Sequence, residues 1–188
     1  GRDLREYALA GLRRSVGFVG QDLFLFSETV EQNLGWGMED AIPRDVALEL
    51  TRSVALDGEI ERLPQGFSTL LGERGVNLSG GQRQRMTIAR ALAKRPSVLI
   101  LDDALSAVDT YTEEEILSRL RTVMRQRTAI IVSHRVSTVR DADQILVLEH
   151  GDIVEQGNHR ELLTRGGAYA TLYNAQFAGA ATYYGMLA

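Results

Sequence analysis

The sequence has 188 residues, 44% of them hydrophobic and 24% charged, which is enough for one substantial core and too short for two large domains. The lack of cysteine excludes disulfides and thiolate metal sites, and neither a signal peptide nor the run of roughly 20 apolar residues that spans a bilayer is visible. A formal net charge of -4 with scattered basic residues argues against a nucleic-acid partner.

The chain begins with a short helical pattern followed by a strand. Residues 3–14 place apolar side chains between charges, which favours a short helix or turn on the surface. Residues 15–21 have a β-type pattern, and this strand would deliver Gln21 to the edge of a sheet. Without its neighbours, a glutamine at this position is equally well explained as an ordinary turn residue.

The next segment, residues 22–34, contains the apolar run Leu23–Phe26. Such a run is costly to expose, so it is either core or a docking surface for a partner. Ser27 is a possible cap for a short helix, which Gly35-Trp36-Gly37 would end. Helix or turn patterns follow at residues 42–53, 55–63 and 64–66.

A glycine turn precedes the following helix. Ser79 is a strong N-cap residue, and Gly80 and Gly81 permit close backbone approach. The helix expected at residues 81–93 therefore begins at a turn that favours phosphate, because its first N–H groups and positive dipole end are open to an anion. The polar positions expected to face water or a partner are Arg83, Gln84 and Arg90.

A short apolar run at residues 98–101 predicts a strand buried on both faces. It ends in two carboxylates, Asp102 and Asp103, at the carboxyl edge where parallel sheets collect ligands. Mg²⁺ with phosphates is the expected occupant. Lys94, the only lysine, is not preceded by the glycine of a phosphate loop, so no such loop exists in this chain.

A second helix and strand follow at residues 110–124 and 128–132. The strand is expected to be buried and to end at Ser133 and His134. A right-handed crossover would bring His134 close to the carboxylates, where an imidazole can contact a transferring phosphoryl group. A histidine with a purely structural role is the alternative.

The C-terminal part has the pattern of a hairpin and two helices. Strands are expected at residues 144–149 and 152–156, helices at 158–165 and 168–177, and His150 and His159 in turns. The tail from Ala178 carries no recognisable chemistry and is expected to be partly disordered.

Four motifs in this order and spacing resemble those of the ATPase domain of ATP-binding cassette (ABC) transporters. They are Leu78–Gln82 as the LSGGQ signature, Val98–Asp102 as the Walker B strand, Ser106–Asp109 as the D-loop and His134 as the switch histidine. Gln21 is similar to the family's Q-loop glutamine. The resemblance implies an α/β fold of the P-loop NTPase (RecA-like) type, with a parallel sheet, an inserted α-helical signature subdomain and a truncated N-terminus.

By this resemblance the chain is one partial ATPase domain. Residues 1–26 and 96–165 would form part of the core sheet, 27–95 the helical subdomain, and 166–188 a C-terminal helix and tail. The family's phosphate loop lies upstream, so Gly1 would be a cut inside a longer protein. The fragment alone is expected to bind ATP poorly and to be inactive.

The resemblance also assigns roles, with ATP and Mg²⁺ as cofactors. Ser79, Gly80, Gly81 and Gln82 would bind the γ-phosphate of an ATP held by a second ABC ATPase domain. Asp102 and Gln21 would hold the metal and the attacking water, Asp103 and His134 would serve hydrolysis, and Asp109 would communicate across the dimer. The expected partners are that second domain and a transmembrane domain, at the cytoplasmic face of the cell membrane.

Asp103 departs from the family, which has glutamate at this position. The shorter side chain predicts slow turnover and a degenerate site, as in exporters of two non-identical subunits. The run Leu23–Phe26 and the loop Gly72–Gly75, in which Glu73 either contacts a coupling helix or is solvated, favour an exporter. The alternative is a non-transport ABC-superfamily ATPase or a regulatory ATP-binding module.

Overall fold

The computed structural model describes the backbone of residues 1–72 and 78–185, so Glu73 and the loop around it lie outside the described residues. The chain divides into two compact units, Gly1–Val132 and Ser133–Ala188. None of the described helices combines the length and apolar character needed to cross a bilayer.

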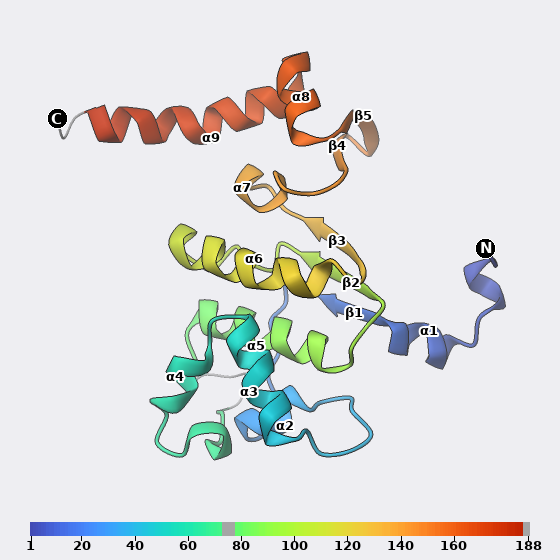
Figure 1. Cartoon of the computed structure of the whole chain (residues 1–188), viewed down its shortest axis with the longest axis vertical. Coiled ribbons are helices and arrows are strands. Elements are labelled where there is room, and N and C mark those ends of the chain that lie inside the picture. Colours follow the sequence, from blue (N-terminus) through green and yellow to red (C-terminus); the bar gives the residue numbers. More distant parts are fainter. Residues whose placement is uncertain (73–77, 186–188) are drawn as a thin grey trace. The chain divides into compact units, whose positions relative to one another are not determined.

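A three-stranded parallel sheet organises the first unit (Figure 1). The strands are β1 (Val16–Val19), β2 (Val98–Asp102) and β3 (Thr128–Val132), in the order β1-β2-β3. Phe18 pairs with Ile100, and Ile100 pairs with Ile130. The three strands expected from the sequence are therefore confirmed, and all three end at one edge of the sheet.

The helices of this unit lie in the connections between these strands and ahead of β1. Both connections step in the same direction across the sheet, so right-handed crossovers place their helices on the same face. The helical elements are η1 (Leu4–Glu6), α1 (Leu9–Ser15), α2 (Val30–Leu34), α3 (Arg44–Ser53), α4 (Asp57–Glu61), η2 (Gly66–Ser68), α5 (Gly80–Ala93) and α6 (Thr110–Met124).

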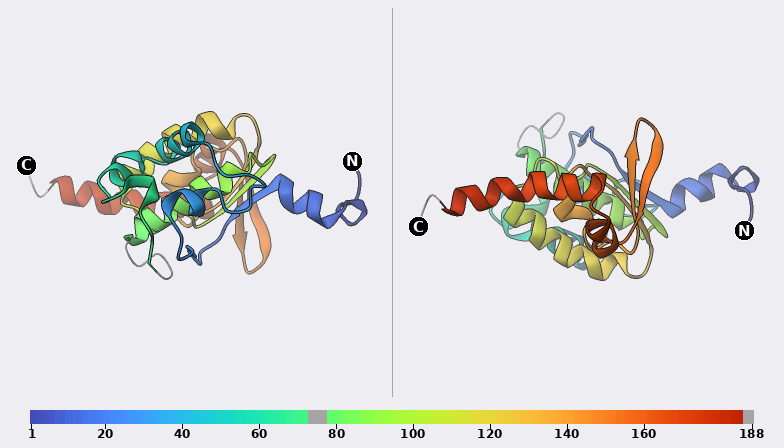
Figure 2. Two further views of the ribbon diagram at one scale, coloured as in Figure 1. Left: turned by 90° about the horizontal axis from the view of Figure 1, so that it is seen from below. Right: turned by 90° about the horizontal axis from the view of Figure 1, so that it is seen from above.

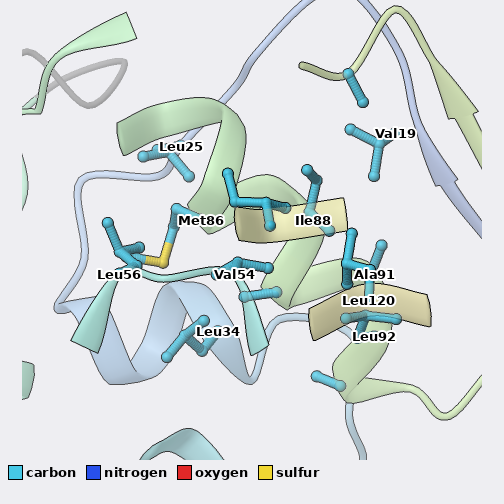
Figure 3. Close-up of a cluster of buried hydrophobic side chains, with 14 of the residues drawn as sticks. Val19, Leu25, Leu34, Val54, Leu56, Met86, Ile88, Ala91, Leu92 and Leu120 are labelled. Carbon is cyan, nitrogen blue, oxygen red and sulfur yellow. The ribbon is translucent and has the colours of Figure 1, made fainter. Parts of the chain in front are cut away.

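The core of the unit lies between the helices and the inner face of the sheet, which carries Val19, Leu99 and Leu101. Gly17 allows α5 to approach this face closely, because a Cβ at this position would lie 2.8 Å from Pro96 Cγ and 3.0 Å from Ala91 O. Fully burying one leucine or isoleucine contributes about 1.5–3 kcal/mol. Figure 3 shows part of this core, including Leu25, Leu34, Val54, Leu56, Met86, Ile88, Leu92 and Leu120.

The opposite face of the sheet is apolar and open. Phe18 is 60% exposed, Ile130 47% and Val132 52%. The prediction that β3 is a buried strand is therefore wrong, and the residues of β2 on this face, Val98 and Ile100, are only half-buried. The physical reason is the topology, since both crossovers cover the same face and the other face receives no helix from the described part of the first unit.

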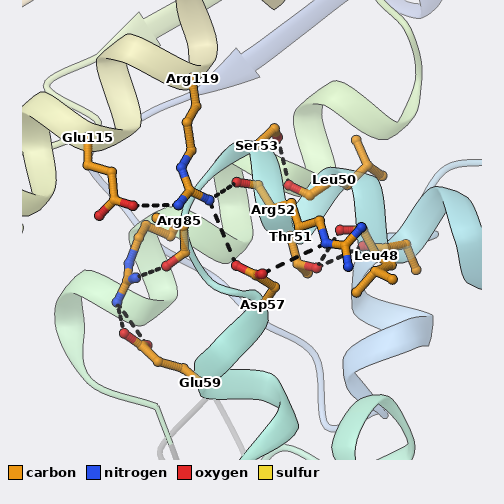
Figure 4. Close-up of polar contacts among 12 residues, drawn as sticks. Leu48, Leu50, Thr51, Arg52, Ser53, Asp57, Glu59, Arg85, Glu115 and Arg119 are labelled. Atoms are coloured by element: carbon orange, nitrogen blue, oxygen red, sulfur yellow. Dashed lines mark hydrogen bonds and ion pairs between the residues drawn. The ribbon is translucent and has the colours of Figure 1, made fainter.

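Two arginines hold α5 and α6 against the preceding helices (Figure 4). Arg85, only 7% exposed, bonds both carboxylate oxygens of Glu59 at 2.8 and 2.9 Å. Arg119 on α6 donates to Arg52 O at 2.6 Å and pairs with Glu115. Both of these bonds come from one nitrogen, Nη2, while Nη1 donates to Ala55 O at 2.5 Å and Nε to Gly81 O at 3.3 Å. Arg85 therefore fastens α5 to Glu59 of α4 and to the backbone just before α4.

The segment before α2 is organised by Asn33, which is fully buried. Its side-chain oxygen accepts from Phe26 N at 2.9 Å, and its amide donates to the carbonyls of Phe26, Glu28 and Thr29 at 3.1–3.2 Å. Thr29, not Ser27 as expected, caps α2 in a capping box with Gln32. The cap lies two residues later because Asn33 closes residues 26–29 into a turn.

We expect Asn33→Leu to lower the free energy of unfolding by about 2 kcal/mol, because the substitution leaves several part-buried backbone groups without their hydrogen-bond partner. Urea unfolding of the purified protein measures this change. Gln126→Leu, which alters an exposed amide after α6, is the matched control and should change stability by less than about 0.5 kcal/mol. Equal stability of the two variants would contradict the assigned role of Asn33.

The described part of the second unit, residues 133–185, contains a hairpin and three helices. Strands β4 (Ile145–Glu149) and β5 (Asp152–Gly157) pair antiparallel, as expected, and Figure 2 shows them beside the long C-terminal helix. The helices are α7 (Val136–Val139), α8 (His159–Arg165) and α9 (Ala168–Gly185). Helix α9 continues beyond the expected end at residue 177, and His159 begins α8 rather than lying in a turn.

Candidate functional site

The N-terminus of α5 is the best-defined element of the candidate site. Ser79 caps it as predicted: Ser79 Oγ accepts from Gln82 N at 3.2 Å, and Gln82 Oε1 accepts from Ser79 N at 2.8 Å. The side chain of Gln82, expected to contact nucleotide, is used in this capping box. The turn is thus fixed before any ligand arrives, and it presents the first N–H groups of the helix.

Gly80 and Gly81 lie against the loop that follows β2. A Cβ on Gly81 would lie 3.2 Å from Ala107 O, and one on Gly80 3.6 Å from Ala107 Cβ. A side chain at Gly81 would push the helix start away from this loop. Glycine is therefore required here by close packing within the chain, in addition to any contact with an anion.

Gln84 joins the same two segments, a role that the sequence interpretation missed. It was expected to face water or a partner, but it is 2% exposed. Its Nε2 donates to Ser106 Oγ at 3.0 Å, and its Oε1 accepts from Ala107 N at 2.8 Å. The sequence contains one indication that Gln84 is buried. It lies four residues before Ile88 and eight before Leu92, so it shares the helix face that packs.

The carboxylates Asp102 and Asp103 lie at the end of β2, as predicted. Asp102 pairs in register with Val132, and Asp103 N donates to Val132 O at 2.9 Å. Asp103 has a φ of 51°, in the left-handed region that aspartate tolerates better than most residues. Mg²⁺ commonly uses one or two protein carboxylates together with phosphate oxygens, so this donor set fits the ion.

Gln21 follows β1 after a single residue and is exposed. Because β1 and β2 are parallel neighbours with Val19 opposite Leu101, Gln21 and the carboxylates emerge at the same edge of the sheet. The sheet thus places an amide and two carboxylates on adjacent strands.

Asp109 is exposed and begins α6 as its N-cap. Its Oδ1 accepts from Thr112 N at 3.0 Å, and this hydrogen bond is the main reason why the pKa of the Asp109 carboxyl lies below its ordinary value. The aspartate expected to signal across a dimer therefore also fixes the junction of the D-loop and α6.

His134 is exposed and lies at the start of the second unit, directly after Ser133. Its expected proximity to Asp102 and Asp103 stays a prediction, because each unit is described by itself. The backbone around His134 is ordered by Ser133, whose hydroxyl accepts from Arg135 N at 3.0 Å.

The apolar segment at residues 23–26 divides between core and surface. Leu25 is fully buried, whereas Phe24 is 49% exposed. Phe26 stacks on Trp36, itself 49% exposed, with the ring centroids 3.7 Å apart. Arg90 donates to Phe24 O at 2.7 Å, and burial lowers the pKa of its guanidinium, so it is less open to water than expected.

Comparison with known proteins gives a consistent result. The family model described as ABC transporter matches residues 1–106. An ATP-dependent lipid A-core flippase of Hahella chejuensis is 51% identical over 181 residues, which cover 96% of this chain and 31% of the relative. Heavy metal tolerance factor 1 of Caenorhabditis elegans is 44% identical over 95% of this chain and 22% of the relative.

A solved structure agrees with these relatives. The structure of a bacterial Atm1-family ABC exporter with ATP bound is 44% identical, with a TM-score of 0.88 over 94% of this chain and 31% of that chain. The present chain therefore spans about a third or less of the length of these proteins, and the expected α/β fold with a parallel sheet is confirmed.

Proposed function

The chain belongs to the ABC transporter family and forms part of an ATP-binding domain of the exporter type, and from this premise we propose that it hydrolyses ATP to drive export of a substrate across a membrane. One observation carries the proposal. The capped turn Ser79–Gly81 is joined through Gln84 to the loop that begins at the Asp102 and Asp103 carboxylates. The helix start to which we assign phosphate and the strand end to which we assign the metal are therefore joined within one chain by hydrogen bonds.

The turn is positioned to complete a site on a second ATPase domain. Gly80 and Gly81 present N–H groups and Ser79 presents a hydroxyl at the positive end of α5, which favours the γ-phosphate of an ATP held by that domain. Since a Cβ on Gly81 would lie only 3.2 Å from Ala107 O, the turn packs closely on the D-loop, and its movement on ATP binding would be passed to that loop and Asp109. ATP binding would close the dimer, and hydrolysis would reopen it.

The other residues serve the ATP bound by this domain itself. Asp102 and Gln21 would hold Mg²⁺ and orient the attacking water, and the metal would neutralise charge on the β- and γ-phosphates. Asp103 would accept the proton of that water, and His134 would donate a hydrogen bond to the γ-phosphoryl group.

The aspartate at position 103 supports a slow site. Its carboxylate lies one methylene short of the glutamate usual in the family, and a displacement near 1 Å can reduce a rate about a hundredfold. We therefore assign this chain to the less active half of an assembly with a non-identical partner. The intact signature would then complete the faster site of that partner.

The open face of the sheet suits the rest of the ATPase domain. Parallel sheets are almost always covered on both faces, and Phe18, Ile130 and Val132 are exposed in this chain. We assign this face to the part of the full-length protein that carries the phosphate loop. This chain alone would accordingly bind ATP poorly and lack activity.

The half-exposed rings of Phe24 and Trp36 are assigned to docking of the transmembrane domain at the cytoplasmic face of the cell membrane. Phe26 stacks on Trp36 and meets Phe24 edge-on, and Asn33 fixes the backbone of Phe26, so the surface is preformed. The relative named as a lipid A-core flippase makes a lipid the first substrate class to test.

Reconstitution of the full-length protein in lipid vesicles tests the proposed function. ATP is expected to drive a fluorescently labelled lipid from one leaflet to the other, and a lipid substrate should stimulate ATP turnover. Asp102→Asn, which removes the metal-binding charge at nearly constant volume, should abolish both. ATP turnover that responds to no membrane component would instead favour a non-transport ATPase.

A further inference from the structure

The backbone that carries His134 is held from a distant part of the chain. The side-chain amide of Gln176 on α9 makes two hydrogen bonds to it: Nε2 donates to His134 O at 2.6 Å, and Oε1 accepts from Val136 N at 2.8 Å. The two backbone groups lie on either side of Arg135, the residue that follows the histidine. One planar side chain thus fixes both the position and the tilt of this segment.

Helix α9 is a firm base for this contact because its first turn is anchored in the second unit. Tyr169 is 2% exposed, its N–H donates to Glu155 Oε2 on β5 at 2.7 Å, and its hydroxyl lies 2.7 Å from His159 Nδ1. Tyr169 belongs to the same core as Val136, the first residue of α7. Gln176 therefore extends from a helix whose start cannot shift without breaking this core.

Only a side-chain amide satisfies both backbone groups. It offers one donor and one acceptor about two bonds apart, whereas glutamate offers acceptors alone and methionine offers neither strong group. Helix α7 has no side-chain cap from its N-cap residue Arg135, so Gln176 Oε1 supplies the acceptor at the helix start.

We propose that Gln176 is a positioning residue for ATP hydrolysis: through its two hydrogen bonds it holds His134 in the orientation that contacts the γ-phosphoryl group. This inference rests on the proposed role of His134. It gives the C-terminal helix a part in hydrolysis, because Gln176 acts through the backbone of residues 134–136 and not on the nucleotide itself. Displacement of α9 would release the 134–136 segment and slow the reaction without removing any catalytic group.

The test uses the full-length protein in its assembled state and measures kcat and KM for ATP. Gln176→Met keeps the length of the side chain and removes both hydrogen bonds, and it is expected to lower kcat about tenfold with KM changed by less than about twofold. Gln176→Glu keeps the acceptor for Val136 N and loses the donor, so it should give an intermediate loss. Asn174→Ala, which removes another exposed amide of α9, should leave kcat unchanged.

A double variant separates positioning from general stability. If Gln176 acts through the histidine, His134→Ala combined with Gln176→Met should be no slower than His134→Ala alone. Losses that multiply in the double variant, or normal kcat in both Gln176→Met and Gln176→Glu, would overturn the inference and leave the role of His134 intact. Normal kcat in His134→Ala would remove the proposed role of the histidine, and the inference with it.

Discussion

Replacing Gly81 with valine is expected to reduce ATP turnover at the partner's site more than about a hundredfold while leaving this chain's own ATP site occupied. The reason is local and steric. A Cβ at this position lies 3.2 Å from Ala107 O, so the branched side chain pushes the start of α5 away from the D-loop. The phosphate-facing turn is then displaced from the pocket that it completes. Vanadate-trapped nucleotide, assigned to each chain by photo-crosslinking, measures the two sites separately.

Gly58→Val is the matched control, because a Cβ at this helical glycine of α4 has open space around it. It should leave both sites active. If Gly81→Val instead lowered trapping mainly at its own chain's site, the signature would act within one domain and the proposed arrangement of the dimer would be wrong.

Lengthening the side chain at position 103 is expected to raise ATP turnover at this chain's site, and removing its charge is expected to lower it. Asp103→Glu should raise it about tenfold, because the longer side chain reaches the attacking water. The gain should fall short of a hundredfold, since position 103 has a φ of 51°, which glutamate tolerates less well than aspartate. Asp103→Asn keeps the size and backbone preference, removes the base, and should lower turnover about a hundredfold.

These variants are compared by single-turnover hydrolysis in the assembled protein with the partner's site inactivated. A wild-type rate already equal to that of Asp103→Glu would contradict the assignment of a slow site. Unchanged hydrolysis in Asp103→Asn would show that the carboxylate takes no part in proton transfer.

Local features of the fold could be predicted because neighbouring residues determine them. Helix α6 occupies residues 110–124 as expected, since its apolar stripe is regular and Asp109 provides a cap. The three strands were also found from their composition. The open sheet face could not be found in this way, because β2 and β3 have the apolar sequence of strands that are covered on both sides. Topology, and not periodicity, decides which face receives the helices.

The same distinction between local and tertiary determinants applies to the residues of the candidate site. Ser79 and the Asp102–Asp103 pair lie at element ends, where residue type and position identify them. Gln84 and Asn33 look like surface amides in the sequence, and only the segments packed around them reveal their hydrogen bonds. Gln176 lies 40 residues from Val136 in the chain, so no local pattern joins them. The hydrogen bonds of buried and bridging amides depend on tertiary structure, which local sequence patterns do not predict.

ATP turnover by the full-length protein in lipid nanodiscs, compared between discs that hold one ATPase domain and discs that hold two, tests the central claim most directly. If the signature turn of one domain completes the pocket of the other, hydrolysis per domain should be confined to the discs that hold two. Equal turnover per domain in discs that hold a single copy would contradict a nucleotide site shared between domains.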